Sequence, residues 1–198
     1  ISMSVKALEM PGYDPRGIQG MGLAYATSNR GACHLRGYMT SPEVLGSPAL
    51  IDRFKTEGKA SLTMLLQNIS AATDSMVLCR FSQFALNPDH YARLLRSVTN
   101  VPFAGRDLIN IGERIYNLER AFNVREGFSR KDDSLPRRLL QTPLLEGHSK
   151  NTTVALDPML DEYYKLRGWT NDGVPTTSTL SELRLHDASK QISYIYSI

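Results

Sequence analysis

The feature that most constrains this chain is a stepped apolar pattern between residues 105 and 123. Apolar side chains recur there at intervals of 3, 4, 3 and 4 residues, at Leu108, Ile111, Ile115, Leu118 and Phe122. Residues with this spacing share one face of an α-helix. The pattern therefore predicts a helix over about 105–123 with one apolar seam facing a core.

Two further segments show helix signals of the same kind. A helix over roughly 60–72 is predicted by Leu62, Leu65, Leu66 and Ile69. The second segment has a helix start signal at 87–89, where an asparagine N-cap, a proline and an acidic first turn follow one another. Behind it the helical spacing continues in Tyr91, Leu94, Leu95 and Val98.

Three more helices are expected with weaker signals. Asp157 and Pro158 repeat the cap signature and open a helix over Met159–Arg167, which Gly168 is placed to end. A short helix is expected over 177–184. The segment 18–29 is rich in glycine and alanine, so a helix there requires tight packing to offset the roughly 1 kcal/mol that glycine costs relative to alanine.

Strand signals are weak throughout. The candidates, such as Thr152–Leu156, are short and isolated, so the predicted fold class is all-α and multihelical. The connection Val124–Leu156 is long for a compact domain, and it is expected either to be mobile or to lie across another surface. We divide the chain into a helical region 1–123 and a second region 124–198, whose aromatic, β-prone end at 190–198 is not placed.

Composition excludes several classes of protein. With 198 residues and 41% hydrophobic content the chain is long enough for a core, yet no apolar run approaches the roughly 18 residues that span a bilayer. The 23 Lys+Arg and 20 Asp+Glu are interleaved, so nothing indicates nucleic acid. Two cysteines without a signal peptide favour the cytoplasm. The start at Ile1 suggests a piece of a longer polypeptide.

Few residues suggest chemistry by their spacing. Cys33 and His34 are adjacent, but neighbouring residues of a helix point about 100° apart, which argues against a nucleophile with its base. A zinc site from Cys33, His34, Cys79 and His90 has suitable ligand types without the paired spacing of known sites. The glycine-rich stretch 17–22 lacks the dinucleotide-binding order, and close helix packing explains it better.

The segment 74–79 is the more informative one. Asp74 stands at the expected end of a helix, where its charge opposes the helix dipole, so it needs donors from the following turn or from a ligand. Cys79 follows on the way to Phe81 and Phe84. In such apolar company a free cysteine is usually a small hydrophobic residue. Composition alone thus favours a turn cap and a packed thiol.

Several blocks, taken in order, resemble the tungsten-containing aldehyde ferredoxin oxidoreductase family. They are YDPRG at 13–17, GMGLAYATSNRGACHLR at 20–36, GERIYNLERAFNVREG at 112–127 and LDPMLDEYYKLRGW at 156–169. The resemblance extends from about residue 8 to 185. It implies that the chain corresponds to the family's C-terminal helical domains and lacks the β-rich N-terminal domain that holds one face of the cofactor.

The resemblance also implies a function. Family members oxidise aldehydes to carboxylic acids and pass two electrons to ferredoxin through a [4Fe-4S] cluster, with tungsten held by two pterin cofactors of molybdopterin type. Three cluster cysteines lie upstream in the family, and one thiolate does not hold a four-iron cluster, so this chain alone is expected to be inactive and free of cofactor. The implied partners are the N-terminal domain, ferredoxin, a small aldehyde and, in the full-length protein, a second copy. No nucleic acid or membrane is implied.

Site residues follow from the family motif D-x-x-G-L-C, which matches at Asp74, Leu78 and Cys79. The resemblance makes Cys79 the fourth cluster ligand and Asp74 an acceptor of pterin N–H groups, with Leu78 beside it. Val77 replaces the motif's glycine. If that glycine serves a positive φ, the valine is expected to shift the loop and weaken pterin binding.

Two basic residues complete the implied site. His34 resembles a family histidine near the metal that exchanges a proton, since imidazole titrates near neutrality. Arg36 resembles a basic residue that reaches the anionic cofactor.

Two alternatives remain open. One is a helical structural or binding module without redox activity, which is favoured if His34 and Cys79 lie in separate apolar pockets. The other is a hydrolase or zinc enzyme in which Cys33, His34 and Cys79 converge. The redox hypothesis instead predicts Asp74 and Cys79 on one exposed loop near His34.

Overall fold

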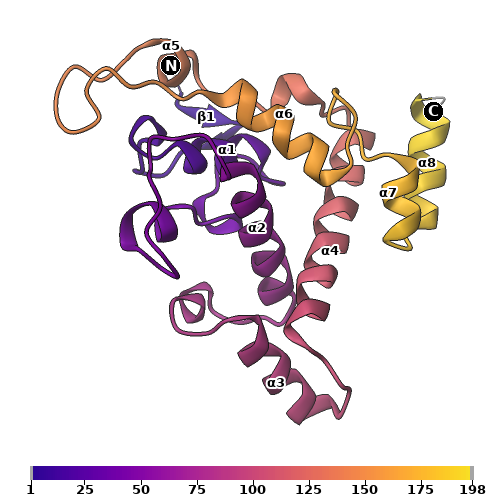
Figure 1. The fold of residues 1–198 in the computed structure, drawn as a ribbon. Helices are drawn as coiled ribbons and strands as arrows, with labels where there is room; N and C mark the ends of the chain where they lie inside the picture. The colour runs from indigo at the N-terminus through magenta and orange to yellow at the C-terminus, as the bar shows by residue number, and fades with distance from the viewer. Residues whose placement is uncertain (1, 197–198) are drawn as a thin grey trace.

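The computed structural model of the chain describes residues 2–196, and they form a helical assembly (Figure 1). The helices are α1 (Gln19–Thr27), α2 (Lys59–Ser75), α3 (Pro88–Thr99), α4 (Gly105–Arg125), α5 (Arg137–Gln141), α6 (Leu156–Arg167), α7 (Thr177–Glu182) and α8 (His186–Tyr196). Short turns of helix are η1 (Pro15–Gly17), η2 (His34–Arg36), η3 (Ser41–Leu45), η4 (Arg80–Phe84) and η5 (Arg130–Asp132). The described strands, β1 (Ser4–Val5) and β2 (Leu8–Glu9), form one small antiparallel pair. The all-α prediction is confirmed.

Helix α1 is tightly packed, as its glycine content requires. All nine of its residues are buried, so it lies in the middle of the molecule. A Cβ atom added at Gly22 would stand 2.7 Å from Val154 Cγ1, and one at Gly20 would stand 2.4 Å from Met39 Cε. The glycines therefore allow neighbouring segments to approach α1 more closely than larger residues would.

Helix α4 corrects the prediction for its apolar seam. The helix has nearly the expected bounds, but of the five seam residues only Leu108 is buried, while Leu118 is 49% and Phe122 is 55% exposed. The face that packs against the chain mixes small, polar and apolar residues, which besides Leu108 include Gly112, Tyr116, Asn117, Arg120, Ala121 and Val124. Close contact with α2 and buried hydrogen bonds decide the orientation of α4, so its apolar seam faces outward.

A buried polar network joins α2, α4 and α6. The Arg167 guanidinium on α6 donates to Asn68 Oδ1 and Glu113 Oε2, each at 2.7 Å, and to Gln67 Oε1 at 2.9 Å. Its Nε atom also donates to the Tyr163 hydroxyl at 2.9 Å. The three helices are thus held together by one cation as well as by apolar packing.

The long connection packs on the helices of the chain itself. Leu135 and Leu139 are buried in the main core, and η5 and α5 interrupt the loop. The buried Asp133 pairs with Lys6 at 2.7 Å and with Arg120 at 2.8 Å. Burial raises the pKa of Asp133, but these two cations outweigh it and hold the pKa below its usual value. Of the two expectations for this segment, lying across a surface is the one observed.

Helix ends were predicted with mixed success. Asn87 caps α3 by accepting from the His90 N–H, and Gly168 ends α6 in the left-handed conformation, as predicted. Asp157, however, lies in the first turn of α6 and is not its N-cap, because the helix begins at Leu156 behind Ala155. Residues 152–155 form no strand.

The C-terminal segment corrects a further expectation. Residues 190–196, expected to be β-prone, belong to α8, and residues 197–198 lie outside the described part. Ile192 is buried beside Ala121 and Val124 of α4, so tertiary packing overrides the local preference here. Among residues 2–196 no helix has the length and apolar character needed to cross a membrane.

Candidate functional site

The segment 74–79 joins the end of α2 to η4. Asp74, expected just after the helix, lies in the last turn of α2, because the helix extends to Ser75. Its Oδ2 atom accepts a hydrogen bond from Arg36 Nη1 of η2. This ion pair supplies the compensating donor that a carboxylate at a helix C-terminus needs. The Oδ1 atom has no hydrogen-bond partner within residues 2–196 and can accept from another group.

The motif's glycine position has a clear structural role. Beyond the C-cap Met76, the Val77 N–H donates to Asp74 O at 3.0 Å and the Leu78 N–H donates to Thr73 O at 3.4 Å. These two bonds make a Schellman motif, whose residue after the cap is left-handed and is most often glycine. Val77 occupies this position with φ of 56° and is 92% exposed.

The strain at Val77 leads to a first prediction. Val77→Gly is expected to raise the free energy of unfolding by about 1 kcal/mol, because a β-branched residue at positive φ carries a cost that glycine avoids. The matched control is Val98→Gly, since Val98 is also exposed but helical, and it is expected to lose about 0.5 kcal/mol. Urea unfolding followed by Trp169 fluorescence measures both. Equal destabilisation by the two variants would show that Val77 is not strained.

Cys79 is exposed, so the interpretation of a packed, small hydrophobic thiol is wrong. It directly precedes η4, and the neighbouring Leu78, Phe81 and Phe84 are also exposed large apolar residues. The thiol and three apolar side chains thus stand at the surface of the described chain.

His34 lines a small cavity of about 90 Å³ together with aromatic rings. Its ring centroid lies 5.4 Å from that of Tyr13 and 5.9 Å from that of Tyr38, and the two tyrosine hydroxyls are 3.0 Å apart. Burial, together with the charges of Arg30 and Arg80, lowers the pKa of His34. The imidazole is therefore neutral at pH 7 and can accept a proton.

Arg80 is a residue that the sequence reasoning missed. It follows Cys79 in the chain and lines the same cavity as His34, so the loop that carries Cys79 continues into this cavity. Burial lowers the pKa of Arg80 to about 10, so the guanidinium stays charged at pH 7. Its Nη1 atom and the Nε atom of Arg36 are buried without a hydrogen-bond partner in the described chain. The sequence signal that could have led to Arg80 was its position directly after Cys79.

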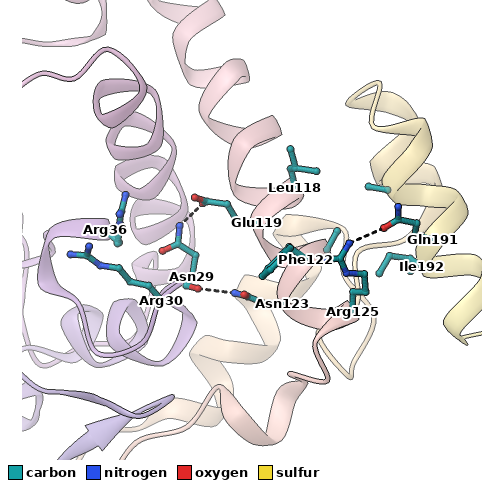
Figure 2. A pocket seen from close by; sticks show the side chains of 12 residues that line it. Asn29, Arg30, Arg36, Leu118, Glu119, Phe122, Asn123, Arg125, Gln191 and Ile192 are labelled. Atoms are coloured by element: carbon teal, nitrogen blue, oxygen red, sulfur yellow. Dashed lines mark hydrogen bonds between the residues drawn. The ribbon is translucent and has the colours of Figure 1, made fainter.

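A larger groove of about 560 Å³ lies between the segment after α1, helix α4 and helix α8 (Figure 2). Figure 2 shows Arg30 and Arg36 on one side, Leu118 and Phe122 on α4, and Gln191 and Ile192 on α8. Arg36 therefore borders this groove and also holds Asp74.

The zinc and hydrolase alternatives find no support in this geometry. No group of three metal-ligating side chains occurs among residues 2–196. His90 is used in the capping box of α3, where its Nδ1 atom accepts from the Asn87 N–H at 3.2 Å. Cys33 is buried and accepts from Arg30 Nη2 at 2.9 Å. The residues of this alternative thus have separate structural roles.

Comparison with known families gives the class of protein: the chain is a helical part of an oxidoreductase family. Residues 1–185 match the family model described as "Aldehyde ferredoxin oxidoreductase, domains 2 & 3". The chain belongs to the aldehyde ferredoxin oxidoreductase family.

Similar proteins agree with this family. The chain is 48% identical to a tungsten-containing aldehyde ferredoxin oxidoreductase of Pyrococcus furiosus over 185 residues, which are 92% of this chain and 31% of that protein. It is also 48% identical to the enzyme of the same name from Thermococcus kodakarensis over 174 residues, 87% of this chain and 29% of that one. The chain thus spans about 30% of the length of these relatives.

A solved structure of another protein shares the fold. The active-site complex BamBC of benzoyl coenzyme A reductase, solved with 1,5-dienoyl-CoA, superposes with a TM-score of 0.60 at 19% identity, covering 76% of this chain and 22% of that one. At this level of identity the likeness concerns the fold alone.

Proposed function

We propose that this chain is the C-terminal part of an enzyme that oxidises aldehydes to carboxylic acids, with ferredoxin as electron acceptor, through a tungsten-pterin cofactor and a [4Fe-4S] cluster. One observation carries the proposal. Cys79 is exposed on a loop that begins at the Asp74–Arg36 pair and continues into Arg80, which shares a cavity with His34. A redox site shared with other parts of the polypeptide requires such an open arrangement.

The residues present suit the implied groups. The Cys79 thiolate would supply one of the four ligands of the cluster, leaving three to the rest of the polypeptide. Asp74 Oδ1 can accept N–H groups of a pterin, while Arg80 Nη1 can donate to its anionic parts and Arg36 can add positive charge beside them. When bound, the tungsten-pterin group and the cluster supply the two-electron oxidation and its delivery to ferredoxin.

His34 has a defined task in this proposal. Oxidation of an aldehyde takes one oxygen atom from water and releases two electrons and two protons. One ring nitrogen of the neutral His34 would accept one of these protons. The rings of Tyr13 and Tyr38 would hold the imidazole in place and exclude water from its side of the cavity.

The competing function is a helical structural or binding module that has the fold without redox activity. That alternative expects His34 and Cys79 in separate apolar pockets, and an exposed Cys79 speaks against it. The division at residues 123 and 124, the cytoplasmic location, homo-oligomer formation and the inactivity of the isolated chain stay predictions.

The testing experiment is metal analysis of the anaerobically purified full-length polypeptide, with its iron-sulfur absorption spectrum. Cys79→Ala is expected to remove most of the cluster iron, because a four-iron cluster loses one of its four ligands. Cys33→Ala is the matched control, since Cys33 is buried against Arg30, and it is expected to leave the iron content unchanged.

Three outcomes would contradict the proposal. Iron and tungsten absent from the full-length protein would favour the structural module. Unchanged iron in Cys79→Ala would exclude Cys79 as a ligand. Zinc bound by the isolated chain would return attention to Cys33 and His34.

A further inference from the structure

The groove between α4 and α8 combines an apolar floor with basic edges. The floor includes Leu118 and Phe122 of α4 and Ile192 of α8, and its volume of about 560 Å³ falls in the range of binding sites in proteins. Leu118 and Phe122 are about half exposed. A concave site with exposed apolar side chains suits an occupant that carries apolar groups.

The charges around the groove are unbalanced. Its lining residues include three arginines, Arg30, Arg36 and Arg125, but one carboxylate, that of Glu119. Glu119 already accepts a hydrogen bond from Asn29, and Arg125 pairs with Glu126 beside the groove. Arg30 forms no ion pair within the described chain. The groove is therefore complementary to an occupant with apolar groups and negative charge.

Two further atoms show that the groove is incomplete. Arg36 Nε and Asn29 Oδ1 are buried and have no hydrogen-bond partner among residues 2–196. Buried polar atoms of native proteins are nearly always satisfied, so a donor and an acceptor are expected from the occupant.

The length of the relatives indicates what the occupant is. About 70% of each relative lies outside the part that this chain covers, so the full-length polypeptide has ample sequence to fill the groove. We propose that a segment from that remainder lies in the α4–α8 groove, with apolar side chains on Leu118 and Phe122 and a carboxylate against Arg30 and Arg36. Because Arg36 also binds Asp74, the same contact would fix one wall of the candidate site.

Cysteine labelling tests this proposal. Phe122→Cys, made in this chain and in the full-length polypeptide, is treated with a maleimide, and the wild-type rate is subtracted to remove labelling of Cys33 and Cys79. We expect labelling to be at least about 100-fold slower in the full-length protein, because the segment covers position 122. Leu145→Cys, on an exposed loop residue away from the groove, is the matched control and is expected to react alike in both.

A second variant tests the charge. Arg30→Glu, combined with Phe122→Cys in the full-length protein, is expected to restore labelling by about tenfold or more, because it would repel the segment's carboxylate. Equal labelling of Phe122→Cys in both proteins would overturn the proposal. Protection already present in this chain and lost on dilution would assign the groove to a second copy. Protection lost on denaturation and refolding, with a released small molecule, would assign it to a ligand.

Discussion

Replacing Arg167 by methionine is expected to lower the free energy of unfolding by about 3–5 kcal/mol. The Arg167 side chain is 0% exposed and donates to acceptors from α2, α4 and α6. Methionine fills part of the volume, but it leaves Asn68 Oδ1 without a donor and removes the cation that pairs with the partly buried Glu113 carboxylate. Removing one member of a buried charged network costs more than the network itself stabilises.

The Arg167 prediction is measured by urea unfolding of the chain, with Trp169 as its single tryptophan probe. Arg167→Lys is expected to lose less, because it retains the charge while losing the fixed fork of donors. Arg125→Met is the control, since Arg125 forms an exposed pair with Glu126, and its loss is expected to be below about 1 kcal/mol. Similar losses of unfolding free energy for Arg125→Met and Arg167→Met would show that the buried network around Arg167 does not dominate the stability of the fold.

A single methyl group added at Gly112 is expected to cost about 3 kcal/mol or more. The Cβ atom of an alanine there would stand 1.9 Å from the backbone oxygen of Asn68 and 2.5 Å from its carbonyl carbon. A backbone does not move aside as a flexible side chain does, so α4 and α2 would have to separate. Alanine is otherwise favoured over glycine in a helix by about 1 kcal/mol. A lower free energy of unfolding in Gly112→Ala would therefore indicate the close backbone contact and not helix propensity.

The same unfolding experiment tests Gly112→Ala. Gly12→Ala is the matched control, because a Cβ atom at Gly12 would meet no atom within 4 Å, and it is expected to be nearly neutral. The effect of Gly112→Ala should be less than additive with that of Arg167→Met, because Asn68 takes part in both contacts. Full additivity, or a stable Gly112→Ala protein, would contradict the close approach of the two helices.

Local signals in the sequence predicted most helices. Periodic spacing, the Asn87 cap and the glycine at 168 depend on neighbours a few residues away, which is why they could be read directly. Helix α8 was missed because its residues favour other conformations locally and are held by Ile192 against α4. The start of α6 was misplaced by three residues, at Met159 instead of Leu156, because helix ends are less clearly marked in a sequence than helix interiors.

The sequence predicted which residues belong to the candidate site better than it predicted how they are arranged. A family motif led to Asp74, Leu78 and Cys79, but not to the pairing of Asp74 with Arg36, which are 38 residues apart in the chain. Arg80 was missed because the sequence does not reveal that its Nη1 atom is buried without a hydrogen-bond partner in the described chain.

The sequence by itself determined the helical class, the family and the glycine-like position at Val77, since these depend on short-range spacing and on ordered motifs. The tertiary structure alone decided which face of each helix is buried. On α4 the apolar seam at Leu118 and Phe122 faces outward, while Gly112 and polar side chains face α2. Close backbone approach and a shared buried cation outweigh apolar periodicity there, and both depend on residues far apart in the chain.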